Sequence, residues 1–257
     1  MKIVVCVKQV PATDSKIQPA ADGKSADLSS VEWIINPYDE FAIEEALRLT
    51  EKSGGEVVVV SVGGAKVQDA MRTALALGAA RAVVLDDPAY ASGDALTVSA
   101  ALAALVKREE PALVFCGKQA VDDDQMAIPA MLAERLDWPQ ATVVVKLELA
   151  ADGASAKAER EVEGGHEEWE IQLPAVIAAQ KGLNEPRYAS LKGIMQAKKK
   201  PVEVVSASDL GLPAPTAMAV ETVTQPSQER KNRILDGDPD QQVAELVRIL
   251  REDEKIF

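Results

Sequence analysis

The chain has 257 residues, of which 47 % are hydrophobic and only 4 % aromatic, and a formal net charge of −13. Its apolar residues are therefore mostly aliphatic, as is typical of strands buried beneath helices on both faces. The acidity argues against sequence-independent binding to nucleic acid, which needs a basic surface, and no apolar run approaches the roughly 18 residues of a membrane span.

Strand and helix patterns alternate through the first part of the chain. The strand patterns lie at residues 2–10, 56–64, 81–87 and 112–117, and the helix patterns lie at residues 36–55, 65–79, 94–110 and 122–139. This alternation predicts an α/β fold with a doubly wound, mostly parallel sheet. Since Met1 leads directly into the first strand, we expect no signal or transit peptide and a cytoplasmic location, or the mitochondrial matrix in a eukaryote.

After residue 140 the pattern changes. Residues 141–150 and 156–174 have the alternation of antiparallel strands, with a turn at Gly164–Gly165, and residues 175–180 predict one more strand. The sequence therefore predicts an antiparallel extension of the parallel sheet.

The last part of the chain is rich in proline and polar residues before it ends in an amphipathic helix pattern at residues 241–257. A long irregular stretch is unusual inside a compact domain, and the final helix has an apolar face to bury. We therefore predict an α/β domain at residues 1–205 and an extended C-terminal arm at residues 206–257 that packs on a partner chain.

Two cysteines and one histidine give little material for metal or nucleophile chemistry. Cys6 and Cys116 each lie in an apolar run, as is typical of buried small side chains, and His166 lies in a Gly–Gly turn. Because the sequence has no His/Cys cluster, we expect neither a metal site nor catalytic residues of the Cys-His or Ser-His-Asp kind.

Ligands of open parallel sheets bind at the carboxyl ends of the strands. Four loops reach that edge: the loop after the first strand, "NPYDE" at 36–40, "SVGGA" at 61–65 and "GKQAVDDDQMA" at 117–127. A helix that starts near Asp123 would offer free N–H groups to a phosphate. The sequence contains neither G-x-G-x-x-G nor a P-loop, so these residues predict a nucleotide-binding domain without naming the nucleotide.

The consecutive carboxylates Asp122, Asp123 and Asp124 have two interpretations. They could accept ribose hydroxyls or hold a metal that bridges phosphates. Alternatively, one of them caps the helix and the others stabilise its start. Because carboxylates repel phosphate, we expect backbone amides to hold a phosphate here.

Several stretches resemble the beta subunit of electron transfer flavoprotein, in order, from residue 3 to about residue 205. They are "CVKQV", "INPYDEFAIEEALRL", "RTALALGA", "GKQAVDDD", "LDWPQAT" and, most specific of all, "LNEPRYASLKGIMQAKKK". The resemblance implies an alpha–beta heterodimer that carries electrons from acyl-CoA and related dehydrogenases, as in fatty acid oxidation, to a membrane quinone oxidoreductase. Such a chain is an electron-carrier subunit and not an enzyme, because the redox chemistry belongs to the flavin.

The resemblance also implies the cofactors and their sites. The redox FAD lies mainly on the alpha subunit, Tyr38 faces that flavin, and the beta subunit holds a structural AMP on the strand-end loops. The implied cofactor-binding residues are Cys6, Asn36, Pro37, Tyr38, Asp39, Val62, Gly117, Lys118, Gln119, Ala120, Val121, Asp122, Asp123, Asp124, Gln125, Met126, Ala127 and Ile128.

The basic segment at about residues 184–200 matches the recognition loop of the family. Leu191 matches the anchor leucine that enters an apolar pocket on a partner dehydrogenase, with Ile194 and Met195 beside or beneath it, while the flanking charges steer the encounter. The alternative is that these three residues seat a surface helix on the sheet. Glu161 matches an acid that pairs with an alpha-subunit arginine, and its alternative is a solvated strand charge.

Residues 125–130, "QMAIPA", depart from the polar Asn-Gln-Thr-Gly-Gln of the ordinary class. Phosphate would then depend on backbone amides and Gln125, which leaves open AMP, a second FAD or an empty pocket. "DDD" and "LNEPRY" favour the ordinary class, whereas "CVKQVP" favours the electron-bifurcating class, in which the beta subunit binds its own FAD and oxidises NADH. The remaining alternative is a stand-alone adenine-nucleotide-binding protein or hydrolase.

Overall fold

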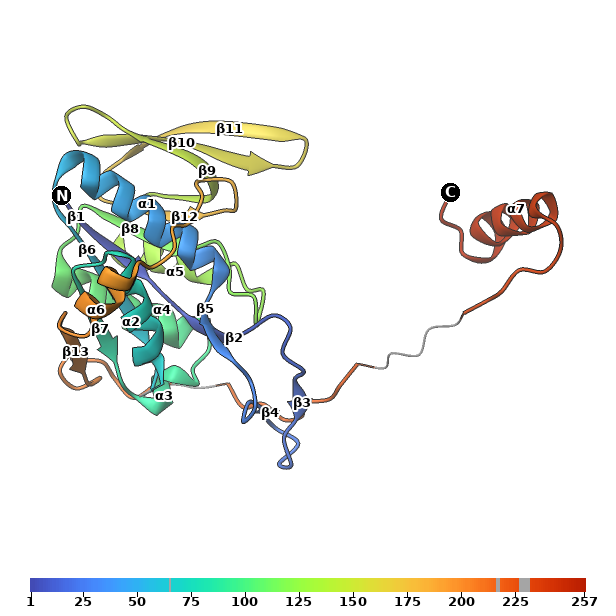
Figure 1. The fold of residues 1–257 in the computed structure, drawn as a ribbon, viewed down its shortest axis with the longest axis horizontal. Coiled ribbons are helices and arrows are strands. Elements are labelled where there is room, and N and C mark those ends of the chain that lie inside the picture. Colours follow the sequence, from blue (N-terminus) through green and yellow to red (C-terminus); the bar gives the residue numbers. More distant parts are fainter. Residues whose placement is uncertain (65, 216–217, 227–231) are drawn as a thin grey trace. The chain divides into compact units, whose positions relative to one another are not determined.

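The computed structural model describes residues 1–64, 66–215, 218–226 and 232–257 (Figure 1). These residues form two compact units, Met1–Thr222 and Val223–Phe257, and each is described by itself.

A single large sheet lies at the centre of the first unit. Among the described residues it has nine strands, in the order β11 (Gly165–Gln172), β10 (Ser155–Val162), β9 (Gln140–Leu149), β12 (Ala175–Ala179), β8 (Leu113–Gly117), β1 (Lys2–Cys6), β6 (Glu56–Val62), β7 (Arg81–Leu85) and β13 (Val202–Val205). The strands from β9 to β13 run parallel, and β10 and β11 add a long antiparallel hairpin at one edge (Figure 1). The predicted mostly parallel sheet with an antiparallel extension is confirmed.

Helices cover both faces of the parallel part. On one face α1 (Pro37–Ser53) and α2 (Val67–Leu77) pack on side chains such as Ile3 and Val57. On the other face α4 (Ala95–Glu109) and α5 (Ala127–Leu136) pack on the alternate side chains, such as Val4 and Val58. Because both faces are covered, β8 and β12 are buried at every position, which explains their continuous apolar sequence.

The first strand is shorter than the sequence pattern predicts. β1 ends at Cys6, and β2 (Gln9–Pro11) pairs instead with β5 (Trp33–Ile35) in a separate small sheet. The chain leaves the large sheet here because the N–H of Lys8 donates to the Asp39 carboxylate, 2.7 Å away, rather than to a strand.

The remaining elements of the first unit are short. They are β3 (Gln18–Pro19), β4 (Ala26–Asp27), α3 (Pro88–Ala91) and α6 (Leu191–Ala197). Beyond the predicted domain end at residue 205, Ala207, Leu210 and Leu212 still pack against the core, and the Tyr90 hydroxyl donates to the Pro213 carbonyl. The first unit therefore continues past the boundary that the sequence suggested.

The second unit contains α7 (Pro239–Arg248), which a π-helical turn η1 (Ile249–Asp253) continues. Asp238 and Gln241 form a capping box: the Asp238 carboxylate accepts from the Gln241 N–H at 2.9 Å, and the Gln241 side chain accepts from the Asp238 N–H at 3.1 Å. Val243 and Leu246 are exposed on this helix. None of the described helices combines the length and apolar composition that a membrane span requires.

Candidate functional site

A cavity of about 200 Å³ opens at the carboxyl ends of β1, β6 and β8. This is the edge of the sheet at which parallel folds bind their ligands. Ten of the predicted cofactor-binding residues line it: Cys6, Asn36, Asp39, Val62, Gly117, Gln119, Ala120, Asp123, Gln125 and Ile128. The fold therefore brings residues from four separate loops together around one cavity.

The other eight predicted cofactor-binding residues lie outside the described lining of the cavity: Pro37, Tyr38, Lys118, Val121, Asp122, Asp124, Met126 and Ala127. Tyr38 and Lys118 lie together, with the Lys118 ammonium 5.1 Å from the centre of the Tyr38 ring. This cation–π pair therefore belongs to a different surface from the cavity.

Sequence reasoning missed one side of the cavity. The segment that follows β7 contributes lining residues from α3, α4 and the turn between them: Ala91, Gly93, Asp94, Ala95, Val98 and Leu102. The rule that selected the other loops applies equally to the carboxyl end of β7, so the signal was present in the strand pattern at residues 81–87. Val7, Lys8, Cys116 and Pro129 also line the cavity without having been predicted.

Asp39 joins the start of α1 to the loop after β1 and to the end of β8. Its buried carboxylate accepts from the Lys8 N–H at 2.7 Å, from the Asn36 amide at 2.9 Å and from the Gly117 N–H at 3.1 Å. Burial raises the pKa of Asp39 to about 7, and these three hydrogen bonds oppose the rise. All three groups donate a hydrogen bond to the carboxylate, so Asp39 holds the wall of the cavity together.

Asn36 links the start of α1 to the loop after β8. It occupies the position before α1, where its side chain makes no cap to its own helix. Instead its amide nitrogen donates to the Gln119 carbonyl at 2.8 Å, and its amide oxygen accepts from the Val121 N–H at 3.2 Å. The "NPYDE" stretch thereby fixes the loop after β8, which is why residues more than 80 positions apart form one wall.

The Asp122–Asp124 stretch does not cap a helix, so that interpretation is wrong. α5 begins at Ala127, four residues later than predicted, and the residue before it, Met126, makes no side-chain cap. Lys8 extends its ammonium to the carboxylates instead, 2.8 Å from Asp122 and 3.0 Å from Asp123. The start of α5 is displaced because the chain first makes a turn that directs these carboxylates towards Lys8.

The floor of the cavity is made of two thiols. Cys6 and Cys116 are both buried and free, at the ends of the neighbouring strands β1 and β8. A hydrogen bond to Cys6 and burial raise the pKa of the Cys116 thiol well above its ordinary value. It is therefore a neutral packing group and not a nucleophile. In the described part of the chain, no group of three or more His, Cys, Asp or Glu side chains is placed to hold a metal ion.

The lining of the cavity combines apolar and charged residues. Val62, Val98, Leu102 and Ile128 supply apolar surface, whereas Lys8, Asp39, Asp94 and Asp123 are charged or titratable. Such a combination suits a ligand that has both a flat apolar ring and a charged group.

A second surface lies on the basic segment at residues 184–200. Leu191 is 82 % exposed and Met195 71 % exposed, and Tyr188 and Ile194 are exposed as well. The buried residue of α6 is Ala197. Leu191 and Met195 therefore do not seat this helix on the protein, which removes the alternative interpretation for them.

Glu161 lies on β10, where its carboxylate accepts from the Gln180 amide at 3.1 Å. The contact is solvent-exposed. Gln180, the residue that follows β12, thus holds Glu161, which remains accessible to another chain.

Comparison with known proteins gives one consistent family. Residues 26–210, which include most of the cavity and the whole basic segment, match the family described as "Electron transfer flavoprotein domain". The chain is 41 % identical over 267 aligned positions to the "Electron transfer flavoprotein subunit beta" of Bacillus subtilis, with 100 % of both chains covered. The same description belongs to similar proteins of Bradyrhizobium diazoefficiens (40 % identity, 98 % of each chain) and Sus scrofa (42 % identity, 89 % of this chain and 90 % of the relative).

Proposed function

This chain belongs to the electron transfer flavoprotein family as a beta subunit, and we propose that it binds a structural AMP and docks acyl-CoA-type dehydrogenases within an alpha–beta heterodimer. It is a subunit of an electron carrier and not an enzyme, since the flavin supplies the redox chemistry. The observation that carries the proposal is the coexistence of a cavity at the strand ends with an exposed apolar residue, Leu191, on a basic segment.

The residues of the cavity fit AMP. Its volume of about 200 Å³ lies below the roughly 300–1,000 Å³ of typical ligand pockets, so of the two nucleotides the smaller AMP is favoured over a second FAD. The apolar residues would hold adenine, and Lys8 and Gln125 would hold the phosphate. Lys8 is a cation of the lining, and its ammonium would have to leave the Asp122 and Asp123 carboxylates to meet the phosphate.

The FAD of the heterodimer lies mainly on the alpha subunit in this proposal, and this chain adds a wall to its site. Tyr38 with its neighbour Lys118 forms that wall, outside the AMP cavity. Glu161 pairs with an arginine of the alpha subunit, and the apolar face of α7 packs on the same subunit. When bound, FAD would supply the redox chemistry by which electrons pass from the dehydrogenase to a quinone oxidoreductase.

The proposal is tested with the heterodimer purified after co-expression of both subunits. An acyl-CoA dehydrogenase, supplied with its acyl-CoA, should bleach the flavin absorbance of the heterodimer, and omission of the dehydrogenase should abolish the reduction. Reduction by NADH without any dehydrogenase would contradict the proposal and identify the electron-bifurcating class instead.

Replacing Lys8 by methionine should weaken AMP binding at least about tenfold and leave adenosine binding unchanged. Methionine keeps the apolar stem but removes the ammonium, and a hydrogen bond to a charged group contributes roughly 1.5–3 kcal/mol. Calorimetric titration of the nucleotide-free heterodimer with AMP and with adenosine measures both affinities.

The matched control for this prediction is Lys107→Met, since Lys107 is exposed on α4 and lies outside the cavity lining. An equal loss of AMP and adenosine binding in the Lys8 variant would show that Lys8 acts through the fold of the loop. Unchanged AMP binding would place the phosphate elsewhere.

A further inference from the structure

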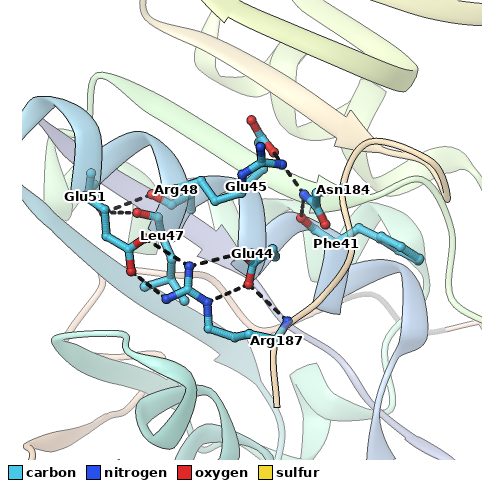
Figure 2. A network of polar contacts seen from close by, with 10 residues as sticks. Phe41, Glu44, Glu45, Leu47, Arg48, Glu51, Asn184 and Arg187 are labelled. Carbon is cyan, nitrogen blue, oxygen red and sulfur yellow. Dashed lines mark hydrogen bonds and ion pairs between the residues drawn. The ribbon is translucent and has the colours of Figure 1, made fainter. Parts of the chain in front are cut away.

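The exposed docking segment is held at its beginning by α1 (Figure 2). The Arg187 guanidinium lies between two carboxylates of that helix, with hydrogen bonds of 2.7 and 3.0 Å to Glu44 and of 2.5 and 3.1 Å to Glu51. The Arg187 N–H donates to Glu44 as well, at 3.2 Å. Arg187 thus joins two carboxylates that are seven residues apart, or nearly two turns of the helix, with two hydrogen bonds to each.

Asn184 adds a second attachment on the same helix. Its side-chain amide donates to the Phe41 carbonyl and to the Glu45 carboxylate, both at 3.0 Å (Figure 2). Residues 184–187 are therefore fixed on α1 through side chains that reach across about 140 positions of sequence.

This attachment depends on arginine in particular. Glu44 is only 6 % exposed, and a buried carboxylate without a cationic partner is strongly unfavourable. Two parallel N–H···O contacts to each carboxylate need the planar guanidinium, which lysine does not have. The network fixes both the position and the direction in which the chain enters the docking segment.

The end of the segment is held by α2. Arg72 donates to the carbonyls of Ala197 at 2.6 Å and Lys200 at 2.8 Å, and the Lys200 ammonium donates to the carbonyls of Leu75 at 2.9 Å and Ala79 at 2.6 Å. With both ends attached, the residues between them are presented outward from a fixed frame.

Close contact with α2 also constrains the middle of the segment. A Cβ atom on Gly193 would lie 2.3 Å from the Ala76 carbonyl oxygen. α6 therefore lies directly on α2 and has Leu191 and Met195 on its exposed side.

We propose that Arg187 is a positioning residue of the docking surface: its double fork to Glu44 and Glu51 fixes residues 188–195 in the conformation that a dehydrogenase binds. The inference rests on the proposed function and deepens it. Binding then requires little ordering of the segment, and this lowers the entropic cost of association. Arg187 need not touch the partner for this effect.

The test measures the KM of an acyl-CoA dehydrogenase for the heterodimer and the kcat of the same reaction. Arg187→Gln should raise KM about tenfold with kcat unchanged, because the docked complex is the same once it forms. Arg187→Lys should restore part of the loss, since it keeps the charge but not the fork. Hydrogen exchange of the amides at residues 188–195 should be faster in the free Arg187→Gln heterodimer.

A second variant separates positioning from stability. Glu44→Gln combined with Arg187→Gln leaves no uncompensated buried charge at position 44, so the fold is retained while the attachment through Arg187 is lost. Its KM should stay raised about tenfold. Lys157→Gln is the control, because it removes a lysine–glutamate pair with Glu168 on the β10–β11 hairpin, outside the docking segment, and it should leave KM unchanged.

Leu191→Ala separates a failure of the proposed docking function from a failure of the positioning role of Arg187. If Leu191→Ala leaves KM unchanged, the docking function itself is wrong. If Leu191→Ala raises KM while the Arg187→Gln variant and the double variant keep the wild-type KM and exchange rates, the docking function holds and the positioning role of Arg187 is overturned.

Discussion

Truncation of Leu191 to alanine should raise the KM of an acyl-CoA-type dehydrogenase for the heterodimer by about tenfold or more. Leu191 is 82 % exposed in the subunit, so its apolar surface becomes buried only when a partner covers it. Anchor residues that fill a partner pocket typically contribute at least about 2 kcal/mol to binding. The same exposure means that the unfolding free energy of the subunit should change by less than roughly 0.5 kcal/mol.

Steady-state kinetics with the heterodimer as the varied substrate, together with urea unfolding, measure both effects. Leu96→Ala is the matched control, because Leu96 is 58 % exposed on α4 and lies outside the docking segment. An equal rise of KM in both variants would show that KM depends on exposed apolar surface in general and not on Leu191 in particular. No rise in the Leu191 variant would remove this residue from the docking surface.

Replacing Gly117 by alanine should abolish nucleotide binding and destabilise the subunit by about 3 kcal/mol or more. A Cβ atom there would lie 2.3 Å from the Asp39 carboxylate oxygen and 2.9 Å from the backbone carbonyl carbon of Tyr38. Neither neighbour is free to move, because three hydrogen bonds hold the Asp39 carboxylate and Tyr38 lies in the first turn of α1. The substitution therefore separates α1 from β8 at the wall of the cavity.

The urea midpoint and the nucleotide content of the purified heterodimer check this result. Gly165→Ala is the control, since its added Cβ would meet no atom within 4 Å. Retention of AMP at full occupancy by the Gly117→Ala variant would show that the α1–β8 contact does not form the nucleotide site.

The helix α1 connects the two functional regions of this account. Its first turn carries Asp39, which braces the cavity, and its later turns carry Glu44 and Glu51, which hold Arg187. A single helix thus contacts both the wall of the cavity and the start of the segment at residues 184–200. This explains why the chain has several buried or half-buried carboxylates on one helix.

Much of the fold could be predicted from the sequence because aliphatic runs and helical spacing report burial directly. The ends of the strands and helices were harder to predict. β1 ends at Cys6 because Asp39, more than 30 residues away, takes the N–H of Lys8. α5 begins at Ala127 because Lys8 draws Asp122 and Asp123 into a turn before it. Both endpoints are decided by contacts between distant residues, which local patterns do not contain.

The candidate site could likewise be predicted only in part. The strand-end rule predicts the loops that carry Asn36, Gly117 and Gln125, and it holds equally for the segment after β7, whose residues also line the cavity. Resemblance to the family supplied Leu191, whose exposed position agrees with the proposed role. The pairing of Arg187 with Glu44 could not be predicted, since the sequence offers Arg187 many carboxylates and only the fold selects two of them.

The nucleotide content of the purified heterodimer tests the central claim most directly. The complex is denatured, and the released FAD and AMP are separated by chromatography and quantified per heterodimer. We expect one FAD and one AMP per heterodimer, as the proposed function requires. Two FAD without AMP would contradict the account and make this subunit a second flavin site, and one FAD alone would show that the cavity does not bind AMP.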